Sequence, residues 1–129
     1  MFRFFKIKKK EIDDSRFFNG KIDPIQLEKF SAYARNKDAI PRDYFTYEEF
    51  VNLFNLSNGY PFVFIFDDIS FAISNGQDMG CLVNIELERF SEKKIADTEL
   101  DFINPKDLLE NLKIDGHTIK EIWNELQKG

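Results

Sequence analysis

Residues 60–90 constrain the fold more than any other part of this 129-residue chain. Their sequence, YPFVFIFDDISFAISNGQDMGCLVNIELERF, contains long apolar runs that are typical of β-strands. Residues 62–66 are continuously apolar, which predicts a strand buried on both faces. A second apolar run covers residues 69–74, and residues 80–90 then alternate, which predicts a strand with one solvent-exposed face. We therefore expect this block to form the centre of a β-sheet.

Turn signals divide this block, and weaker strand patterns lie outside it. Asp67 and Asp68 end the first apolar run, and Asp is common in hairpin turns because its side chain bonds to nearby backbone amides. Asn75-Gly76 is the strongest local turn signal in the chain. Residues 95–103 alternate less regularly and predict a fourth strand, and residues 2–8 predict a short strand with a protective lysine-rich end. The pattern predicts a mainly antiparallel sheet of about four to five strands.

The flanking segments carry the start signals of helices. In a capping box, two side chains three residues apart satisfy each other's backbone amides. The start signals are Asp23 with Gln26, Thr46 with Glu49, Thr118 with Glu121, and Asn104-Pro105. The first helix is expected to bury an apolar face formed by Ile25, Leu27, Phe30, Tyr33 and Ala34. The sequence therefore predicts a single α+β domain over residues 1–129, with about four helices covering the sheet.

The charge of the chain is unevenly distributed and favours a basic protein partner. Its net charge is −5, but five Lys or Arg and no acid lie within residues 1–10, so residues 11–129 carry −10. An acidic body repels phosphate backbones and attracts cationic surfaces, which argues against nucleic acid as a partner. A basic arm at residues 1–10 for membranes or nucleic acid is the less favoured alternative, because the rest of the chain opposes it.

Cysteine content and hydropathy indicate the compartment. One cysteine, Cys81, excludes an internal disulfide and gives no reason to place the chain outside the cytoplasm. No apolar run approaches the roughly 18 residues of a membrane span, and the first residues lack the apolar core and cleavage site of a signal peptide. We therefore expect a cytoplasmic protein without membrane contact, either a monomer or a weak dimer.

Few side chains are candidates for catalysis. Cys81 and His117 are the single members of their types, and we expect a core thiol and a solvated imidazole rather than a catalytic pair. Asp67 and Asp68 would suit a divalent cation, with Asp78 of the next loop close by, but no phosphate-binding loop accompanies them. The favoured interpretation is that these aspartates form a hairpin turn and not a cation site. We expect no enzyme activity, no metal and no cofactor.

Acids on exposed faces are better candidates for binding. The predicted strand at residues 80–90 places Glu86 and Glu88 on its solvent-exposed side. An array of acids can steer a basic partner and fix its orientation. The predicted partner-binding residues are Asp67, Asp68, Asp78, Glu86 and Glu88. A surface that only keeps the protein in solution is an equally weighted alternative.

The C-terminal segment resembles a known class of proteins. Residues 108–123, LLENLKIDGHTIKEIW, combine an Asp-Gly turn with a final Trp-bearing helix. This arrangement is similar to the end of many small immunity proteins of bacterial polymorphic and contact-dependent growth inhibition toxin systems. Residues 40–44, IPRDY, followed by Asn58-Gly59, resemble the Leu-Pro, Asp-Tyr and Asn-Gly-Gly pattern of the SUKH superfamily, which also contains immunity proteins. Here the spacing is longer and Tyr60 replaces the second Gly.

The resemblance implies that the chain binds one toxin tightly and blocks its active site or substrate path. Many such toxins are nucleases with cationic clefts, where an acidic inhibitor mimics phosphate charge. The alternatives are a non-catalytic protein-binding module, a phage-encoded inhibitor and, less favoured, a metal-dependent enzyme that uses Asp67 and Asp68.

Overall fold

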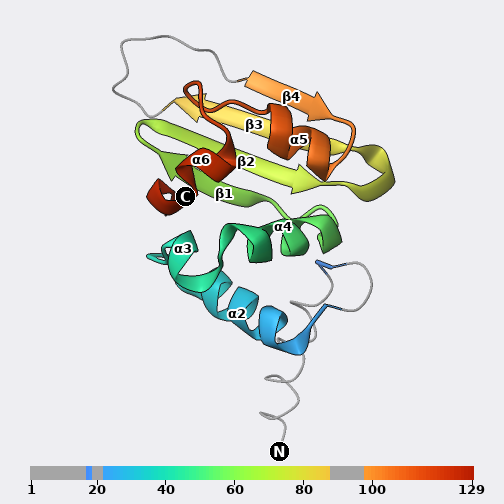
Figure 1. Cartoon of the computed structure of the whole chain (residues 1–129), viewed down its shortest axis with the longest axis vertical. Helices are drawn as coiled ribbons and strands as arrows, with labels where there is room; N and C mark the ends of the chain where they lie inside the picture. Colours follow the sequence, from blue (N-terminus) through green and yellow to red (C-terminus); the bar gives the residue numbers. More distant parts are fainter. Residues whose placement is uncertain (1–16, 19–21, 88–97) are drawn as a thin grey trace, which may run out of the picture.

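The computed structural model describes residues 17–18, 22–87 and 98–129 and has an α+β fold (Figure 1). The helices are α2 (Pro24–Arg35), α3 (Pro41–Tyr44), α4 (Tyr47–Leu56), α5 (Pro105–Asn111) and α6 (Ile119–Ile122), with two 3-10 turns, η1 (Gln77–Met79) and η2 (Trp123–Glu125). The strands are β1 (Phe62–Phe66), β2 (Ile69–Asn75), β3 (Cys81–Leu87), β4 (Thr98–Phe102) and β5 (Gln127–Lys128). The predicted α+β class is confirmed, whereas the strand or basic arm expected within residues 1–10 lies outside the described residues. None of the helices in the described ranges has the length and apolarity of a membrane span.

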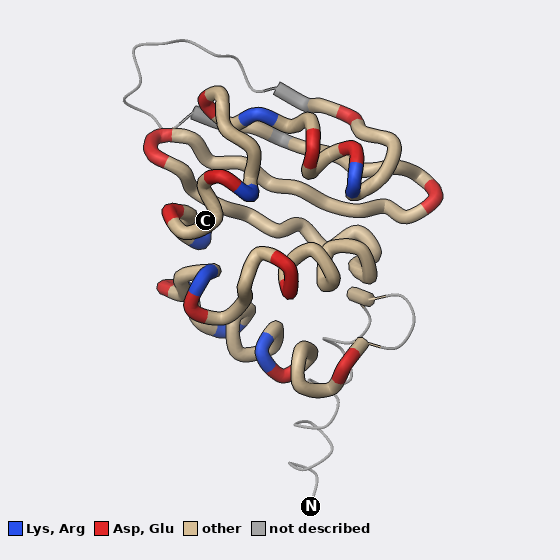
Figure 2. The backbone as a smooth tube through the Cα atoms, viewed as in Figure 1, with Lys and Arg blue, Asp and Glu red and all other residues tan. Residues whose placement is uncertain are grey.

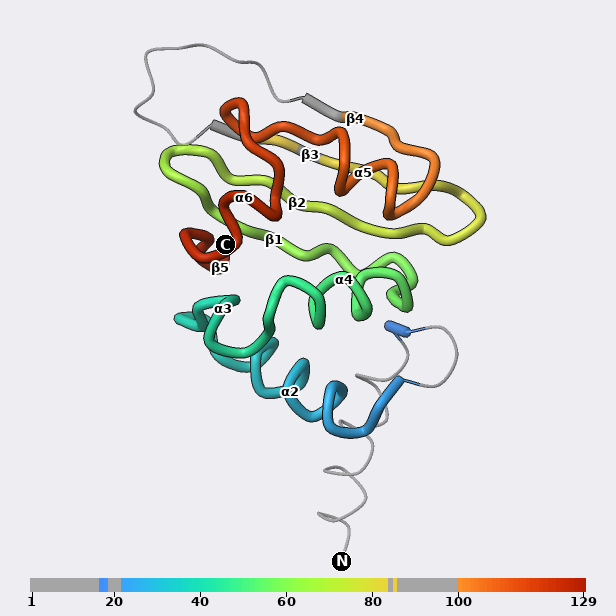
Figure 3. The backbone as a smooth tube through the Cα atoms, viewed as in Figure 1, coloured from blue at the N-terminus to red at the C-terminus, as the bar shows by residue number. Residues whose placement is uncertain are grey.

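The five strands form one antiparallel sheet in the order β4-β3-β2-β1-β5. Strands β1 to β4 follow one another as neighbours, so they form a meander built largely from the predicted central block. Strand β5 comes from the C-terminal segment and pairs with β1 through Phe64↔Lys128 and Ile65↔Gln127. Figure 3 shows the last segment of the chain beside β1, which it reaches from the far end of the sequence.

Helices cover one face of the sheet and leave its other face without a described covering element (Figure 1). The covered face buries alternate residues of three strands: Phe62, Phe64, Phe71, Ile73, Cys81 and Val83. The opposite side, which we call the open face, carries the half-buried residues Val63, Ile65, Ser70, Ala72, Ser74 and Leu82. The prediction that residues 62–66 are buried on both faces is therefore wrong. Val63 and Ile65 stay partly exposed because no described helix packs against them.

Aromatic rings fill the space between the sheet and helix α4. The ring centroid of Phe50 lies 4.8 Å from that of Trp123 and 5.3 Å from that of Phe62. It also lies 5.6 Å from the ring centroid of Phe64. Trp123 Nε1 donates a hydrogen bond to the carbonyl oxygen of Phe45 at 3.0 Å, so the polar atom of this buried ring is satisfied. The C-terminal turn is thereby joined to α4 and β1 by a continuous aromatic core.

Local capping signals set most helix starts. Both Thr46 with Glu49 and Thr118 with Glu121 form complete capping boxes, as predicted. The Asn104 side chain accepts a hydrogen bond from the backbone of α5, which confirms that start as well. The last predicted helix is a single α-helical turn followed by η2, and its apolar stripe is buried: Ile119, Ile122, Trp123 and Leu126.

The first helix departs from its prediction in two details. Asp23 caps α2 by accepting a hydrogen bond from Ile25 N at 2.9 Å. The Gln26 amide does not complete a capping box: its Oε1 accepts no hydrogen bond within the described residues, and its Nε2 donates to Glu49 Oε2 at 2.6 Å. Ile25, expected on the apolar face, is 66% exposed. The tertiary contact with α4 therefore overrides the local signal at Gln26.

Candidate functional site

The β1–β2 turn presents two acids at one end of the sheet. Phe66 pairs with Ile69, so Asp67 and Asp68 form a two-residue hairpin turn. Asp67 has a φ of 55°, a left-handed conformation that Asp adopts more readily than most residues. Both aspartates are exposed. The hairpin turn expected at these residues is observed, and both side chains are exposed.

Asp78 lies at the opposite end of the sheet. It belongs to η1, in the connection between β2 and β3 where Asn75 pairs with Cys81. The seven residues of β2 separate the two turns by roughly 20 Å. The expectation that Asp78 lies close to Asp67 and Asp68 is therefore wrong, because successive turns of an antiparallel meander fall at opposite ends of its strands.

The connection that carries Asp78 is longer than the two-residue turn that Asn75-Gly76 predicts. The chain turns between Gly76 and Gly80, where Gly76 N donates to the Gly80 carbonyl at 2.8 Å. The buried Asn75 side chain accepts a hydrogen bond from Gln77 N at 2.9 Å and donates one to the Phe54 carbonyl at 2.9 Å. These bonds tie the turn to the end of α4 and fix its position.

Strand pairing places further acids on the open face. The register of β3 puts Glu86 on this face, and the register of β4 puts Glu99 and Asp101 there. Glu88 lies outside the described residues. Glu99 and Asp101 were not among the predicted binding residues, although the alternation in residues 95–103 indicated their strand. Their place on the open face depends on the pairing between β3 and β4, which sequence periodicity does not give.

Every formal charge on strands β1 to β4 and on the turns β1–β2 and β2–β3 is negative. The acids are Asp67, Asp68, Asp78, Glu86, Glu99 and Asp101, and residues 62–87 and 98–103 contain no Lys, Arg or His. Figure 2 shows red at both hairpin turns and on β4, and no blue along these strands. The ion pairs in the described part of the chain all lie on helices. We call β1 to β4 with these six acids the acidic sheet.

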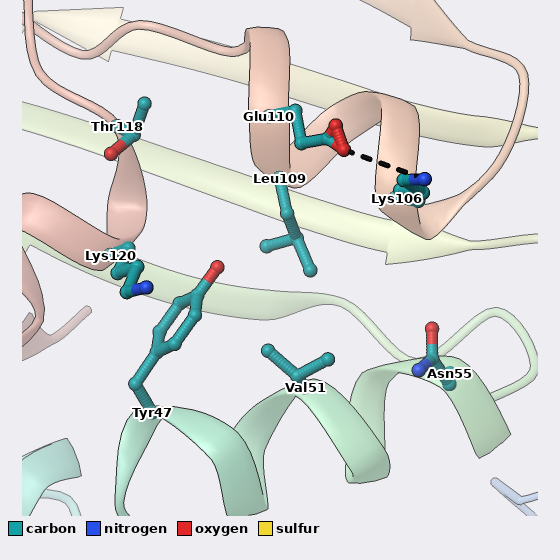
Figure 4. A pocket seen from close by; sticks show the side chains of 8 residues that line it. All are labelled: Tyr47, Val51, Asn55, Lys106, Leu109, Glu110, Thr118 and Lys120. Atoms are coloured by element: carbon teal, nitrogen blue, oxygen red, sulfur yellow. Dashed lines mark ion pairs between the residues drawn. The ribbon is translucent and has the colours of Figure 1, made fainter.

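A groove of about 580 Å³ lies between α4 and the segment that contains α5 and α6 (Figure 4). Val51 and Leu109 point toward each other across it. Lys106 and Lys120 lie at its margins, and Lys106 forms a loose ion pair with Glu110 at 3.9 Å. Because charges of both signs line this groove, it does not select the charge of a partner as the acidic sheet does.

Cys81 and His117 do not form a catalytic pair. Burial and, to a smaller extent, Asp107 raise the pKa of the Cys81 thiol to about 11, so it stays protonated near neutral pH. His117 is exposed, and its ring centroid lies 6.2 Å from that of Phe66. Cys81 and Phe66 lie at opposite ends of the sheet, so the thiol and the imidazole are far apart. The predicted core thiol and solvated imidazole are confirmed.

Comparison with known proteins gives no indication of the function of this chain. No family model, curated protein or solved structure matches it. Within residues 17–18, 22–87 and 98–129, no group of three or more His, Cys, Asp or Glu is arranged to hold a metal ion. The acidic sheet, on which every formal charge has the same sign, is the candidate surface in this part of the chain.

Proposed function

We propose that this protein binds a basic protein toxin through the acidic sheet and neutralises it, as do the immunity proteins that its C-terminal segment resembles. One observation carries the proposal: all charges on β1 to β4 and their two described turns have the same sign. A surface of one sign attracts a basic partner over several ångströms and fixes its orientation. In the described part of the chain, Asp67, Asp68, Asp78 and Asp101 form no ion pair that binding would first have to break.

The spacing of the acids suits a toxin that acts on nucleic acid. The two hairpin turns place Asp67 and Asp68 roughly 20 Å from Asp78, with further acids on the strands between them. A nuclease cleft binds a row of phosphates with Lys and Arg, and a rigid row of carboxylates can occupy the same cations. Blocking the cleft requires no chemical step by this chain. The proposed site of action is the cytoplasm of the cell that the protein protects.

Co-expression with the protein encoded by the gene immediately upstream tests this proposal. We expect the chain to restore growth of cells that express this candidate toxin and to form a stable complex with it in size-exclusion chromatography. Raising the salt concentration from about 0.05 M to about 0.5 M should slow association strongly, because exposed charges are screened.

The control is an unrelated acidic protein of similar net charge, expressed with the same candidate toxin. We expect it to restore no growth, since non-specific attraction does not fix an orientation. Absence of both growth rescue and complex formation with the wild-type chain would contradict the proposed function. A complex whose association rate is independent of salt would contradict the role of the acidic sheet.

A further inference from the structure

Three large apolar side chains are exposed within the described residues. They are Ile25 on α2 at 66%, Met79 in η1 at 93% and Ile103 after β4 at 80%. Ile25 belongs to α2, which Figure 1 shows far from β4. Met79 and Ile103 both lie at the end of the acidic sheet that carries the β2–β3 connection. Clustered exposed apolar residues, unlike scattered ones, mark interaction sites.

Strand pairing and close backbone packing place Met79 and Ile103 at the same end of the acidic sheet. Cys81 pairs with Phe102, so Gly80 and Ile103 are the next residues along the two strands. Gly80 packs so closely here that an added Cβ would lie 2.9 Å from the Phe102 carbonyl oxygen and 3.7 Å from that of Ile103. Its φ of +85° also favours glycine. This contact places η1, and Met79 with it, against the end of β4.

Hydrogen bonds hold both positions before a partner arrives. Gly80 N, which follows Met79, donates to the Gln77 carbonyl at 3.0 Å. Ile103 N donates to Asp107 Oδ2 at the start of α5 at 3.0 Å. An apolar residue on a fixed backbone loses less conformational entropy on binding than one on a flexible loop.

Acids flank this apolar pair. Asp78 precedes Met79, and Asp101 lies on β4 two residues before Ile103. Both aspartates are exposed. Leu82, which pairs with Asp101, extends the apolar surface onto the open face. An apolar centre with a charged rim is the usual composition of a specific interface.

The size of the open face argues for an anchor at its margin. Four strands about 4.8 Å apart and roughly 20 Å long present a face of roughly 400 Å². A stable interface buries about 800 Å² on each partner. The contact surface must therefore extend beyond the strands, and the end with Met79 and Ile103 adds apolar area without interrupting the negative charge.

We infer that Met79 and Ile103 form the apolar anchor at which the basic partner docks on the acidic sheet. The occupant is a protein surface with an apolar pocket set among Lys and Arg side chains, which complement Asp78 and Asp101. This inference rests on the proposed function and specifies which end of the sheet carries most of the binding energy.

Alanine variants test the anchor against the candidate toxin used for growth rescue. Met79→Ala and Ile103→Ala should each weaken the complex by about 10-fold, and the double variant by about 100-fold, measured by calorimetry or surface plasmon resonance. Ile25→Ala is the matched control, because it truncates the third exposed apolar residue, which lies on α2 and not at the end of the sheet that carries Met79 and Ile103. We expect the control to bind like the wild type, and circular dichroism to show that all variants keep the fold.

Methyl NMR gives a readout that does not require a substitution. The chain contains two methionines, so ¹³C labelling of Met ε-methyl groups yields at most two signals, Met1 and Met79. The Met79 signal should shift on addition of the toxin and lose its accessibility to a soluble paramagnetic probe.

The outcomes distinguish failure of the proposed function from failure of the Met79 and Ile103 anchor. If the wild-type chain forms no complex, the proposed function fails and the anchor fails with it. If the wild type binds but the Met79→Ala/Ile103→Ala variant binds equally tightly, or the Met79 methyl stays accessible in the complex, the anchor alone is contradicted. Equal loss of affinity in Ile25→Ala and in the double variant also overturns it, since the effect is then not specific to this end of the sheet.

Discussion

The helical layer and the acidic sheet use their charges in opposite ways. In the helical layer, Glu49 accepts hydrogen bonds from Lys29, Gln26 and the Thr46 amide. Its negative charge is therefore paired with groups of the protein itself. On the sheet, the described aspartates face solvent and take part in no ion pair within the described part of the chain. The comparison teaches that neutralising Glu49 should act on stability, whereas neutralising the exposed sheet aspartates should act on binding.

Truncation of the aromatic core should have the largest effect. Phe50→Ala removes a buried ring that contacts Trp123, Phe62 and Phe64. We expect it to lower the free energy of unfolding by about 3–5 kcal/mol, since it leaves a cavity between α4 and the sheet. Urea denaturation measures the change. Phe50→Leu is the control and should cost less than about 2 kcal/mol; equal losses would show that cavity volume is not the cause.

Lys128 joins the C-terminal strand to the helical layer. Its Nζ donates hydrogen bonds to the carbonyl oxygens of Tyr33 at 2.8 Å, Ala34 at 3.1 Å and Asn36 at 3.0 Å. Lys128→Met keeps most of the apolar stem but leaves these carbonyls at the end of α2 without their donor. We expect a loss of about 1–3 kcal/mol in the free energy of unfolding. The exposed Lys37→Met is the control, and a loss of the same size there would contradict this role.

Glu49 should make the stability of the helical layer depend on pH. Hydrogen bonds from Lys29 and from the Thr46 amide lower the pKa of Glu49 from 4.5 to about 2. A carboxylate with a lowered pKa stabilises the folded state above its ordinary pKa, and this contribution disappears as the pH falls from about 4.5 toward about 2. Glu49→Gln should therefore cost about 1 kcal/mol at pH 7, because solvent screens these partly exposed groups.

The pH profile of this loss distinguishes Glu49 from other acids. The stability difference between wild type and Glu49→Gln should shrink steadily below pH 4.5, as measured by thermal unfolding. The neighbouring exposed residue gives the control, Glu48→Gln, which should change stability by less than about 0.5 kcal/mol at any pH. A Glu49→Gln deficit that persists unchanged at about pH 2 would contradict the assignment.

Neutralising the sheet acids should have the smallest effect on stability. Asp68→Asn, Asp78→Asn and Asp101→Asn each remove an exposed charge without removing an ion pair in the described residues. We expect each to change the free energy of unfolding by less than about 0.5 kcal/mol, measured by urea denaturation. A loss above about 1 kcal/mol in any of them would show that the sheet charges serve the fold rather than a partner.

Features set by neighbouring residues could be predicted from the sequence. The Thr46–Glu49 capping box and the Asp67-Asp68 turn each depend on contacts within three residues. The single buried face of β3 follows from its period-two alternation. The positions of Asp78 and Asp67 at opposite ends of the sheet could also have been predicted from the sequence. Two successive turns of an antiparallel meander must lie at opposite ends of the strand between them.

Features that depend on distant contacts could not be predicted. Gln26 leaves its expected cap because Glu49, 23 residues away, offers a charged acceptor. The partners of Lys128 lie more than 90 residues earlier in the chain. The contribution of Asp101 to the acidic sheet depends on its pairing with Leu82, and the same register places Met79 and Ile103 at one end of the sheet. No local pattern specifies these pairings.

Charge reversal on the two layers tests the central claim most directly. The sheet variant is Asp68→Lys/Asp78→Lys/Asp101→Lys, and the matched helical variant, in the helices and the α2–α3 turn, is Glu28→Lys/Asp38→Lys/Glu48→Lys, which changes the net charge equally at exposed positions. The measurement is the association rate constant with the candidate toxin at low salt. We predict that the sheet variant associates at least about 10-fold more slowly than the wild type and the helical variant less than about 3-fold more slowly. Equal losses in both variants would contradict recognition through the acidic sheet.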